Sequence, residues 1–270
     1  MNAYRPLLLR LVVWLAVAAF LLPTSLLLLW CFVNRWPWPE LIPSAWTFRG
    51  VDRLLSGFMR VDRILFFSIL LSLGVALLST GIATIAARAL CLYQFPGRRL
   101  VEFLCVLPVI VPATVFGMGS HMLFVRLHLN NTVVAVMVSH LICTLPFALR
   151  ILTSVTRAAD RRLEEQAQVL GASALAAFWH GTLPVISPGI VSAMAISFLL
   201  SYTQYFLTML MGGGKIQTLS IIVMPLIAGS DRTISSVYSA LFIGSTLAVF
   251  LLFQAISNAL AKKIGFTLGA

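Results

Sequence analysis

The stretch "RRLEEQAQVLGASALAAFWHGTLP", residues 161–184, interrupts a chain that is otherwise almost continuously apolar. It opens with charged residues, continues as a short amphipathic segment around Gly171, and reaches a proline at Pro184. The stretch is too polar to cross a bilayer, yet its pattern is too regular for a slack loop. A structured, charged element between two apolar segments therefore needs an explanation.

The composition of the chain is that of a membrane protein. Of its 270 residues, 60% are hydrophobic and 10% are charged, whereas soluble domains carry about 25% charged residues. We therefore expect an all-α integral membrane protein, with residues 1–270 forming a single transmembrane domain. The net charge of +11 is attributed to Lys and Arg retained in cytoplasmic loops, and no nucleic-acid partner is expected.

Six segments are apolar and long enough to span a bilayer, which takes about 20 residues. They are residues 11–33, 64–87, 103–125, 132–149, 185–211 and 237–261. The first apolar run is too long for the core of a signal peptide and is interpreted as an anchor. Prolines lie inside several segments, where they predict bent helices; they are Pro23, Pro108, Pro112, Pro146 and Pro188.

The distribution of Lys and Arg predicts the orientation of the spans. With the N-terminus inside, eleven basic residues lie on the inner side: Arg5, Arg10, Arg88, Arg98, Arg99, Arg150, Arg157, Arg161, Arg162, Lys262 and Lys263. Eight lie on the outer side: Arg35, Arg49, Arg53, Arg60, Arg63, Arg126, Lys215 and Arg232. Both termini and residues 150–184 are therefore predicted to be cytoplasmic.

A shorter apolar run, Leu219–Ala228, lies between the fifth and sixth segments and is about half the length of a span. The triple glycine at 212–214 precedes it and supplies a flexible hinge. Such a segment suits either a gate or an inert helix in the membrane interface, and the sequence leaves both open.

The charged stretch itself predicts two short helices joined at Gly171. The first is expected over Asp160–Leu170, with Leu163, Ala167 and Leu170 on one face and its acidic residues near the start. The second is expected over Ala172–Gly181, with Leu175, Phe178 and Trp179 clustered, and Pro184 opening the fifth span. Helices that lie in lipid headgroups are usually rich in Lys and Arg, so the acidic residues favour a protein partner.

Three features of this stretch resemble the EAA loop of ABC importer permeases. They are Glu165-Gln166-Ala167, Gly171 six residues after Glu165, and Pro184 thirteen residues after Gly171. The segments "SHLICTLPF", "LPVISPGI" and "ALCLYQFPGR" are also similar to permeases of the polyamine, sulfate, iron and thiamine branch. The resemblance covers residues 64–261 and is strongest to spermidine/putrescine permeases. Gln166 departs from the alanine usual there but keeps helix propensity.

This resemblance implies a MetI-like permease fold with cytoplasmic coupling helices between the fourth and fifth spans. The loop at 158–184 would insert into a cleft of an ABC ATPase dimer, which binds ATP and Mg²⁺. A second permease subunit, an extracytoplasmic solute-binding protein and a location in the bacterial inner membrane are also implied. Glu165 and Gly171 are carried over as motif positions, while the amphipathic pattern adds Ala167, Ala172, Leu175 and Phe178 as coupling residues.

Other transport and enzyme classes are less well supported. "GGGK" is no Walker A motif, because Met209 and Ile216 stand where glycine and Ser/Thr are required; the chain is expected to hold no cofactor and to hydrolyse no ATP itself. No Asp or Glu lies within a predicted span, which disfavours an ion-coupled secondary transporter, the main alternative, and a channel ranks below it. Neither metal-ligand spacing nor a nucleophile–base pair supports an enzyme. His121 and His140 are interpreted as satisfied buried residues.

A cluster of polar side chains marks a candidate solute pathway in the fifth segment. Within "SFLLSYTQYF", residues 197–206, the candidates are Ser201, Tyr202, Gln204 and Tyr205, because polar groups in a span are costly unless they face a bundle interior or a pathway. In a continuous helix Ser201 would share one face with Gln204 and Tyr205. Hydrogen bonding between helices is the alternative role.

The solute is left open by the sequence. Related permeases often carry acidic residues where Thr203 and Gln204 stand here. Because this carboxylate pair is missing, the resemblance to polyamine permeases does not extend to a polyamine substrate. A polyamine held elsewhere, another small organic solute and an anion all remain open.

Overall fold

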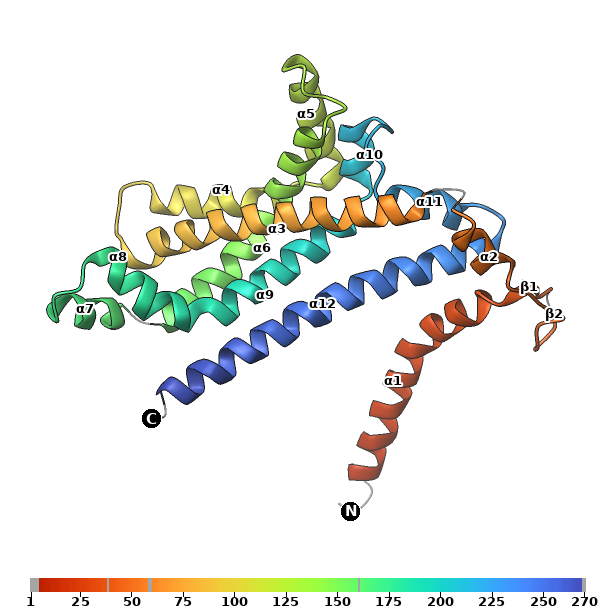
Figure 1. Ribbon diagram of the computed structural model, residues 1–270, viewed down its shortest axis with the longest axis horizontal. Helices are drawn as coiled ribbons and strands as arrows, with labels where there is room; N and C mark the ends of the chain where they lie inside the picture. Colours follow the sequence, from red (N-terminus) through yellow and green to blue (C-terminus); the bar gives the residue numbers. More distant parts are fainter. Residues whose placement is uncertain (1–4, 38, 58–59, 160, 269–270) are drawn as a thin grey trace. The chain divides into compact units, whose positions relative to one another are not determined.

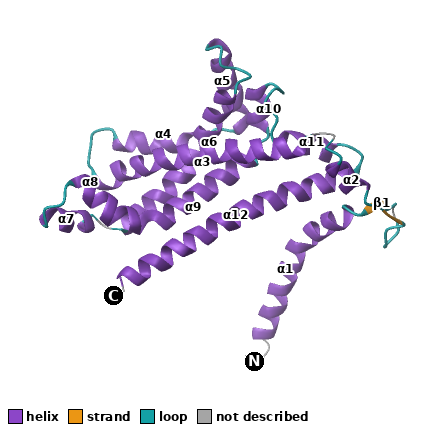
Figure 2. Cartoon of the chain, viewed as in Figure 1, coloured by secondary structure: helices purple, strands orange, loops and turns teal. Residues whose placement is uncertain are grey.

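The computed structural model describes residues 5–37, 39–57, 60–159 and 161–268, and these are mostly helical (Figure 2). Asp160, the expected start of the first short helix, lies outside the described residues. The chain divides into two compact units: one combines residues 1–63 with 222–244, and the other combines residues 64–221 with 245–270. The single domain predicted from composition stays a prediction.

The first unit contains α1 (Arg5–Trp30), the strands β1 (Val33–Arg35) and β2 (Ala45–Trp46), α2 (Arg49–Leu55) and the start of α12 (Arg232–Leu268). The strands pair antiparallel. Arg49 forms an ion pair with Asp231 at 2.9 Å. Gly50 is buried, and a Cβ there would lie 2.8 Å from Cγ2 of Val237, so close packing of α2 on α12 requires glycine.

The second unit is built from helices that pack along α6 (Figure 1). Its principal elements are α3 (Val61–Leu92), α4 (Arg98–Ile110), α5 (Ala113–Arg126), α6 (Val133–Ala158), α9 (Leu183–Tyr202) and α10 (Phe206–Gly212). Helix α6 makes its most extensive contact with α9 and also contacts α4, α5 and α10. The helices that carry the polar residues of the fifth predicted span are therefore positioned mainly by α6.

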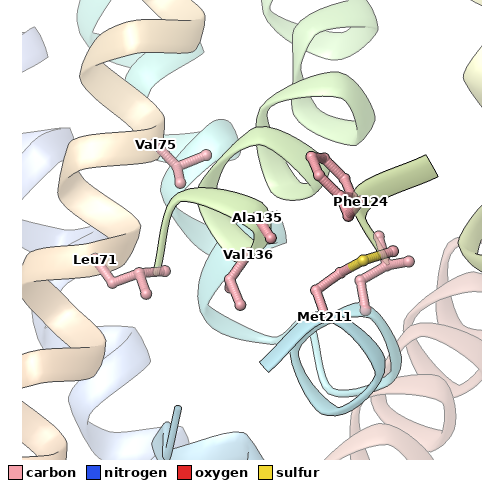
Figure 3. Close-up of a cluster of buried hydrophobic side chains, with 7 residues drawn as sticks. Leu71, Val75, Phe124, Ala135, Val136 and Met211 are labelled. Carbon is pink, nitrogen blue, oxygen red and sulfur yellow. The ribbon is translucent and has the colours of Figure 1, made fainter. Parts of the chain in front are cut away.

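Two hydrophobic clusters hold this unit together. The first joins α3, α5, α6 and α10 (Figure 3) through Leu71, Val75, Phe124, Ala135, Val136, Leu207 and Met211. The second consists largely of small residues and joins α3, α6 and α9 through Ala83, Ala87, Leu90, Ala148, Leu149, Leu152 and Ala193. Small side chains allow the backbones of membrane helices to approach closely.

Among the described residues, five helices are long and apolar enough to cross a membrane, and a sixth crossing is possible if the bent pair α4–α5 counts as one. Large apolar side chains are exposed along these helices, for example Phe20 at 81% and Ile85 at 73%. Exposed apolar surface on this scale does not suit water, and it fits an environment of lipid.

The third predicted span, 103–125, was wrong as a single helix. The chain bends by 106° between α4 and α5. Val111 is extended at φ −75° and ψ 130°, and Pro112 caps α5. A proline disfavours helical backbone in the preceding residue and donates no hydrogen bond, which explains the break at this position.

The fifth predicted span, 185–211, was also wrong as one continuous helix. Helix α9 ends at Tyr202, and α10 begins at Phe206. The Thr203 hydroxyl donates to the carbonyl of Leu199, and the Gln204 amide donates to Ser201 in a tighter turn. Polar side chains that bond to nearby backbone compete with the helical pattern. The polar residues 201–205 therefore lie where α9 ends, and not along one continuous helix.

The short apolar run forms a helix, α11 (Leu219–Ala228). Before it, α10 ends at a left-handed Gly213 (φ +53°), which Gly214 (φ +75°) follows. The amide of Leu219 donates to Ser68 Oγ of α3 at 2.8 Å. The start of α11 is thereby fixed to α3, and its role as a gate or an inert helix stays untested.

Candidate functional site

The charged stretch forms a helix, a tight turn and a second helical segment, as its pattern indicates. Helix α7 spans Arg162–Val169. Gly171 then adopts φ +94°, which glycine reaches without steric cost. Its amide donates to Gln168, and the amide of Ala172 donates to Ala167. Ser173 caps α8 (Ala174–Ala177) by accepting from the Ala176 amide.

The second predicted helix, 172–181, is not a separate element. Helix α8 continues through a π-helical turn, η1 (Phe178–Thr182), directly into α9. In this turn the amide of Leu183 reaches the carbonyl of Phe178, five residues back. The wider turn accommodates Pro184, which lacks an amide donor. Any movement of α8 is therefore transmitted directly to α9.

A buried ion pair anchors the loop to α3. Arg88 Nη1 donates to Glu164 Oε1 at 2.5 Å, and Nη2 donates to Oε2 at 3.1 Å. Thr182 Oγ1 donates to the same Oε1 at 2.7 Å. The Arg88 guanidinium also lies 4.1 Å from the ring centre of Phe178. One arginine thus holds α7 and the π-helical turn against the end of α3.

The electrostatics of Glu164 follow from these contacts. Burial of the carboxylate raises its pKa, but the hydrogen bonds from Arg88 and Thr182 and the charges of Arg88 and Arg161 outweigh burial. The net effect holds the pKa of Glu164 below its ordinary value. The carboxylate therefore stays charged and paired at neutral pH.

The predicted coupling residues divide between exposed and partly buried positions. Glu165 is exposed and pairs with Arg161 at 2.9 Å, and Leu175 is 68% exposed. Ala167, Ala172 and Phe178 are half-buried, and Gly171 is exposed. Leu170 does not share the burial of Leu163 and Ala167, because it is 88% exposed.

Among the described residues, four large apolar side chains of the loop are mostly exposed. They are Val169 (87% exposed), Leu170 (88%), Leu175 (68%) and Trp179 (55%), and together they are named the loop surface. A shallow depression of about 500 Å³ adjoins it, lined by Arg162, Glu165, Gln166, Val169 and Leu170. At this depression, the apolar side chains of Val169 and Leu170 lie beside charged groups of both signs, Arg162 and Glu165.

A second candidate site is a cavity of about 330 Å³ in the helical unit, named the α4–α5 cavity. Its lining comprises Pro108, Val109, Ile110, Val111, Pro112, Ala113, His140, Cys143, Thr144, Phe147, Leu200, Ser201 and Gln204. Ser201 and Gln204 both line it, although the helix that was expected to align them ends between them. None of the lining residues is acidic or a Lys or Arg.

The two tyrosines among the pathway candidates do not line this cavity. Tyr202 is buried, its ring stacks on Phe198 at 5.3 Å, and its hydroxyl lies 2.7 Å from Ser245 Oγ. Tyr205 precedes α10 at its N-cap position. The contacts of Tyr202 are those of a packing residue that joins α9 to α12.

Comparison with known proteins identifies the family. Residues 79–266 match the family described as binding-protein-dependent transport system inner membrane component. The chain belongs to this family. The match begins within α3 and covers α4–α6, the loop at 158–184, α9–α11 and most of α12.

Curated relatives in this family are permease proteins. The chain is 28% identical over 175 residues to a probable sulfate transport system permease protein cysT of Chlorokybus atmophyticus, covering 58% of this chain and 61% of that protein. It is 27% identical over 191 residues to the putrescine transport system permease protein PotI of Escherichia coli K12, covering 67% and 66%. The match thus spans about three fifths of the cysT relative's length.

Solved structures show the same fold. One is a bacterial ABC transporter involved in the import of the acidic polysaccharide alginate, with a TM-score of 0.67, 17% identity and coverage of 94% of this chain and 98% of that chain. Another is a bacterial alginate ABC transporter in complex with an alginate pentasaccharide-bound periplasmic protein, with a TM-score of 0.68, 15% identity and 98% coverage of both chains. These confirm the MetI-like permease fold expected from the sequence.

The contacts that position both sites could not be found from the sequence of this chain. Arg88 and Glu164 lie 76 residues apart, so their pairing depends on the fold. The interpretation of two satisfied buried histidines is confirmed for His140, since both ring nitrogens have hydroxyl partners. It was wrong for His121, which is half-buried and whose Nδ1 has no hydrogen-bond partner among the described residues. A signal for Arg88 existed: it is a charged residue at the end of an apolar helix, where a partner is needed.

Proposed function

We propose that the chain is a transmembrane permease subunit of an ABC importer. In this function it forms half of a solute pathway, and a separate ATPase drives it through the loop at 158–184. The main support is the loop surface: Leu170 and Leu175 are exposed on either side of Gly171, on a loop that Arg88 fixes to α3. An exposed apolar patch on a rigid support is a site for a protein partner.

The charges beside the loop surface favour a protein over lipid headgroups. Glu165 and Gln166 line the depression together with Arg162, whereas helices that bind anionic lipid carry mainly Lys and Arg. In the proposed assembly, the partner is an ABC ATPase dimer that binds ATP and Mg²⁺. A second permease subunit and an extracytoplasmic solute-binding protein complete it in the inner membrane, with both termini cytoplasmic.

The transmission of movement follows from the continuity of the helices. Force on the loop surface reaches α9 through the π-helical turn, because α8 and α9 are continuous. It reaches α3 through Arg88 and Glu164. Helices α3 and α9 both pack on α6 through small residues such as Ala83 and Ala193, so the loop is linked to the helical unit as a whole.

The double variant Leu170→Asp with Leu175→Asp tests this function. Two buried charges at the proposed contact should release the ATPase from the complex purified from native membranes and abolish ATP-driven uptake. Leu41→Asp is the matched control, because Leu41 is also an exposed leucine (92%) but lies in the loop between β1 and β2. Unchanged ATPase content in the double variant, with normal uptake, would overturn the proposal.

Ser201 and Gln204 are proposed to line the solute pathway, since both border the α4–α5 cavity. Gln204→Ala should therefore change the rate or selectivity of uptake while the amount of assembled complex stays normal. Tyr202→Phe, which removes the hydroxyl that meets Ser245, is expected to act on stability alone. Uptake per complex that stays normal in Gln204→Ala would exclude Gln204 from the pathway.

A further inference from the structure

A chain of hydrogen bonds borders the α4–α5 cavity. Thr208, at one end of this chain, determines which groups donate and which accept. Thr208, His140 and Ser201 are all buried. His140 Nε2 lies 3.0 Å from Thr208 Oγ1, and His140 Nδ1 lies 2.9 Å from Ser201 Oγ. Thr208 Oγ1 also donates to the backbone carbonyl of Gln204. Of these groups, Ser201, His140 and Gln204 line the cavity, whereas Thr208 does not.

The number of protons that each group can donate determines which groups are donors and which are acceptors. A carbonyl only accepts, so the single hydroxyl proton of Thr208 is used on Gln204. Thr208 Oγ1 must then accept from His140, which places the ring proton on Nε2. A buried imidazole without a counter-charge is neutral, so Nδ1 is an acceptor and Ser201 donates to it. The opposite direction would give up the bond from Thr208 to the Gln204 carbonyl, which is the shorter of its two hydrogen bonds; the other comes from Ser220 Oγ at 3.2 Å.

Ser201 consequently has no proton left for the cavity and offers only lone pairs. Thr144, the other hydroxyl in the lining, is in the same condition, since its Oγ1 donates to the carbonyl of Leu141 at 3.2 Å. The break at Pro112 exposes both carbonyls of α4 and amides of α5, and the Gln204 side chain has both donor and acceptor atoms. Because both hydroxyls offer only lone pairs, they make the lining of the cavity richer in hydrogen-bond acceptors than in donors.

We propose that the α4–α5 cavity binds an uncharged solute that donates hydrogen bonds through hydroxyl groups, and that Thr208 sets this preference by fixing the His140 tautomer. The inference rests on the proposed function, because it takes the cavity as part of the solute pathway. An oxyanion without protons meets two acceptor hydroxyls here. A cation finds no carboxylate among the lining residues, and an unpaired charge in a membrane interior is costly.

Cys143 gives a direct reading of cavity occupancy, because its side chain borders the cavity. The other cysteines, Cys31, Cys91 and Cys105, are replaced by serine, and the full-length chain is studied in its purified complex in lipid nanodiscs without ATP or binding protein. A small methanethiosulfonate reagent labels Cys143, and added solutes slow the labelling. The probes are 1,4-butanediol and its isomer 1,2-dimethoxyethane, which has two oxygens and no hydroxyl proton, with sulfate as the oxyanion.

Butanediol should protect Cys143 at about fivefold lower concentration than dimethoxyethane, the effect of roughly one hydrogen bond, and sulfate should not protect. Ser201→Ala should weaken the preference, because the Thr144 hydroxyl still accepts. Thr208→Val should also weaken or reverse it, because His140 can then donate from Nδ1 and release the Ser201 proton, whereas Thr208→Ser should retain it. Thr208→Val tests a positioning role, since its side chain lies outside the cavity lining.

Three outcomes would overturn the proposal: equal protection by the two isomers, better protection by sulfate, or an unchanged preference in Thr208→Val. Absence of labelling in the native complex, with full labelling after denaturation, would also overturn it, because the cavity would then be closed to solutes. The assay needs neither ATP nor transport. Loss of the ATPase from the complex would contradict the proposed function without altering this measurement, so the two failures are distinguishable.

Discussion

Arg88 and Glu164 meet through two parallel hydrogen bonds, at 2.5 Å and 3.1 Å, although 76 residues separate them. Both side chains are largely buried, at 20% and 10% exposure. This pair joins the loop at 158–184 to α3, and the carboxylate also accepts from Thr182. The loop is thereby held as a rigid extension of the helical unit.

Removing one partner of this pair should loosen the loop. Arg88→Gln or Glu164→Gln leaves the other group unpaired and should destabilise the loop by about 3 kcal/mol. Hydrogen exchange of the amides in residues 162–182 should then become roughly a hundredfold faster. The matched control is Glu102→Gln, which breaks the more exposed pair of Arg98 and Glu102 within α4. Equal exchange rates in Glu164→Gln and the control would contradict the anchoring role.

The same anchor should weaken in acid. The pKa of Glu164 is lowered in the folded chain relative to its ordinary value of 4.5, so its stabilising effect is fully present above that value. The effect is lost as the pH falls through the lowered folded-state pKa. Loop exchange should therefore accelerate below about pH 4.5 in the wild type, after correction for intrinsic rates, and change less in Glu164→Gln. A parallel acid response in both proteins would exclude Glu164 as its source.

Gly171 should be sensitive to the shape of the backbone and insensitive to side-chain volume. It adopts φ +94°, and a Cβ at this position would meet nothing within 4 Å. Asn tolerates left-handed backbone better than a β-branched residue, so Gly171→Asn should retain more uptake per ATP hydrolysed than Gly171→Val. The expected difference in turn stability is about 1 kcal/mol. Equal coupling ratios in the two variants would show that the turn need not be left-handed.

The proposed orientation predicts opposite accessibility of two exposed positions. Ser44→Cys and Ala174→Cys, each introduced into a cysteine-free background, occupy exposed positions in the structure. An impermeant thiol reagent applied to intact cells should label position 44 and leave position 174 unlabelled until the membrane is opened. Labelling of position 174 alone would reverse the orientation derived from the Lys and Arg counts.

The sequence was sufficient to predict the long apolar helices but not the short helix α2 or the positions where the long helices break. Long apolar runs identify helices by composition alone. Proline was a weaker guide: Pro23, Pro146 and Pro188 lie inside continuous helices, while the chain breaks at Pro112. Whether a proline breaks a helix depends on neighbours that satisfy the freed backbone groups, and the sequence does not give these neighbours.

In the two candidate sites, too, the local features could be predicted from the sequence, whereas the contacts between distant residues could not. The motif around Glu165 and Gly171 is local, so its turn could be predicted, and the positive φ at Gly171 confirms it. The partners that give each site its character come from distant parts of the chain: Arg88 reaches Glu164 from α3, and His140 reaches Ser201 from α6. Such pairings follow from helix packing, which local patterns do not specify.

The central claim is that an ATPase docks on the loop surface, and a photo-crosslinker at position 170 tests it most directly. Benzoylphenylalanine in place of Leu170, which is 88% exposed, is irradiated in native membranes, with the same group at Leu41 as the control. We expect position 170 to crosslink to a chain that carries a Walker A motif, identified by mass spectrometry, and position 41 not to do so. Crosslinks from position 170 to lipid alone, or to the same proteins as position 41, would contradict the account.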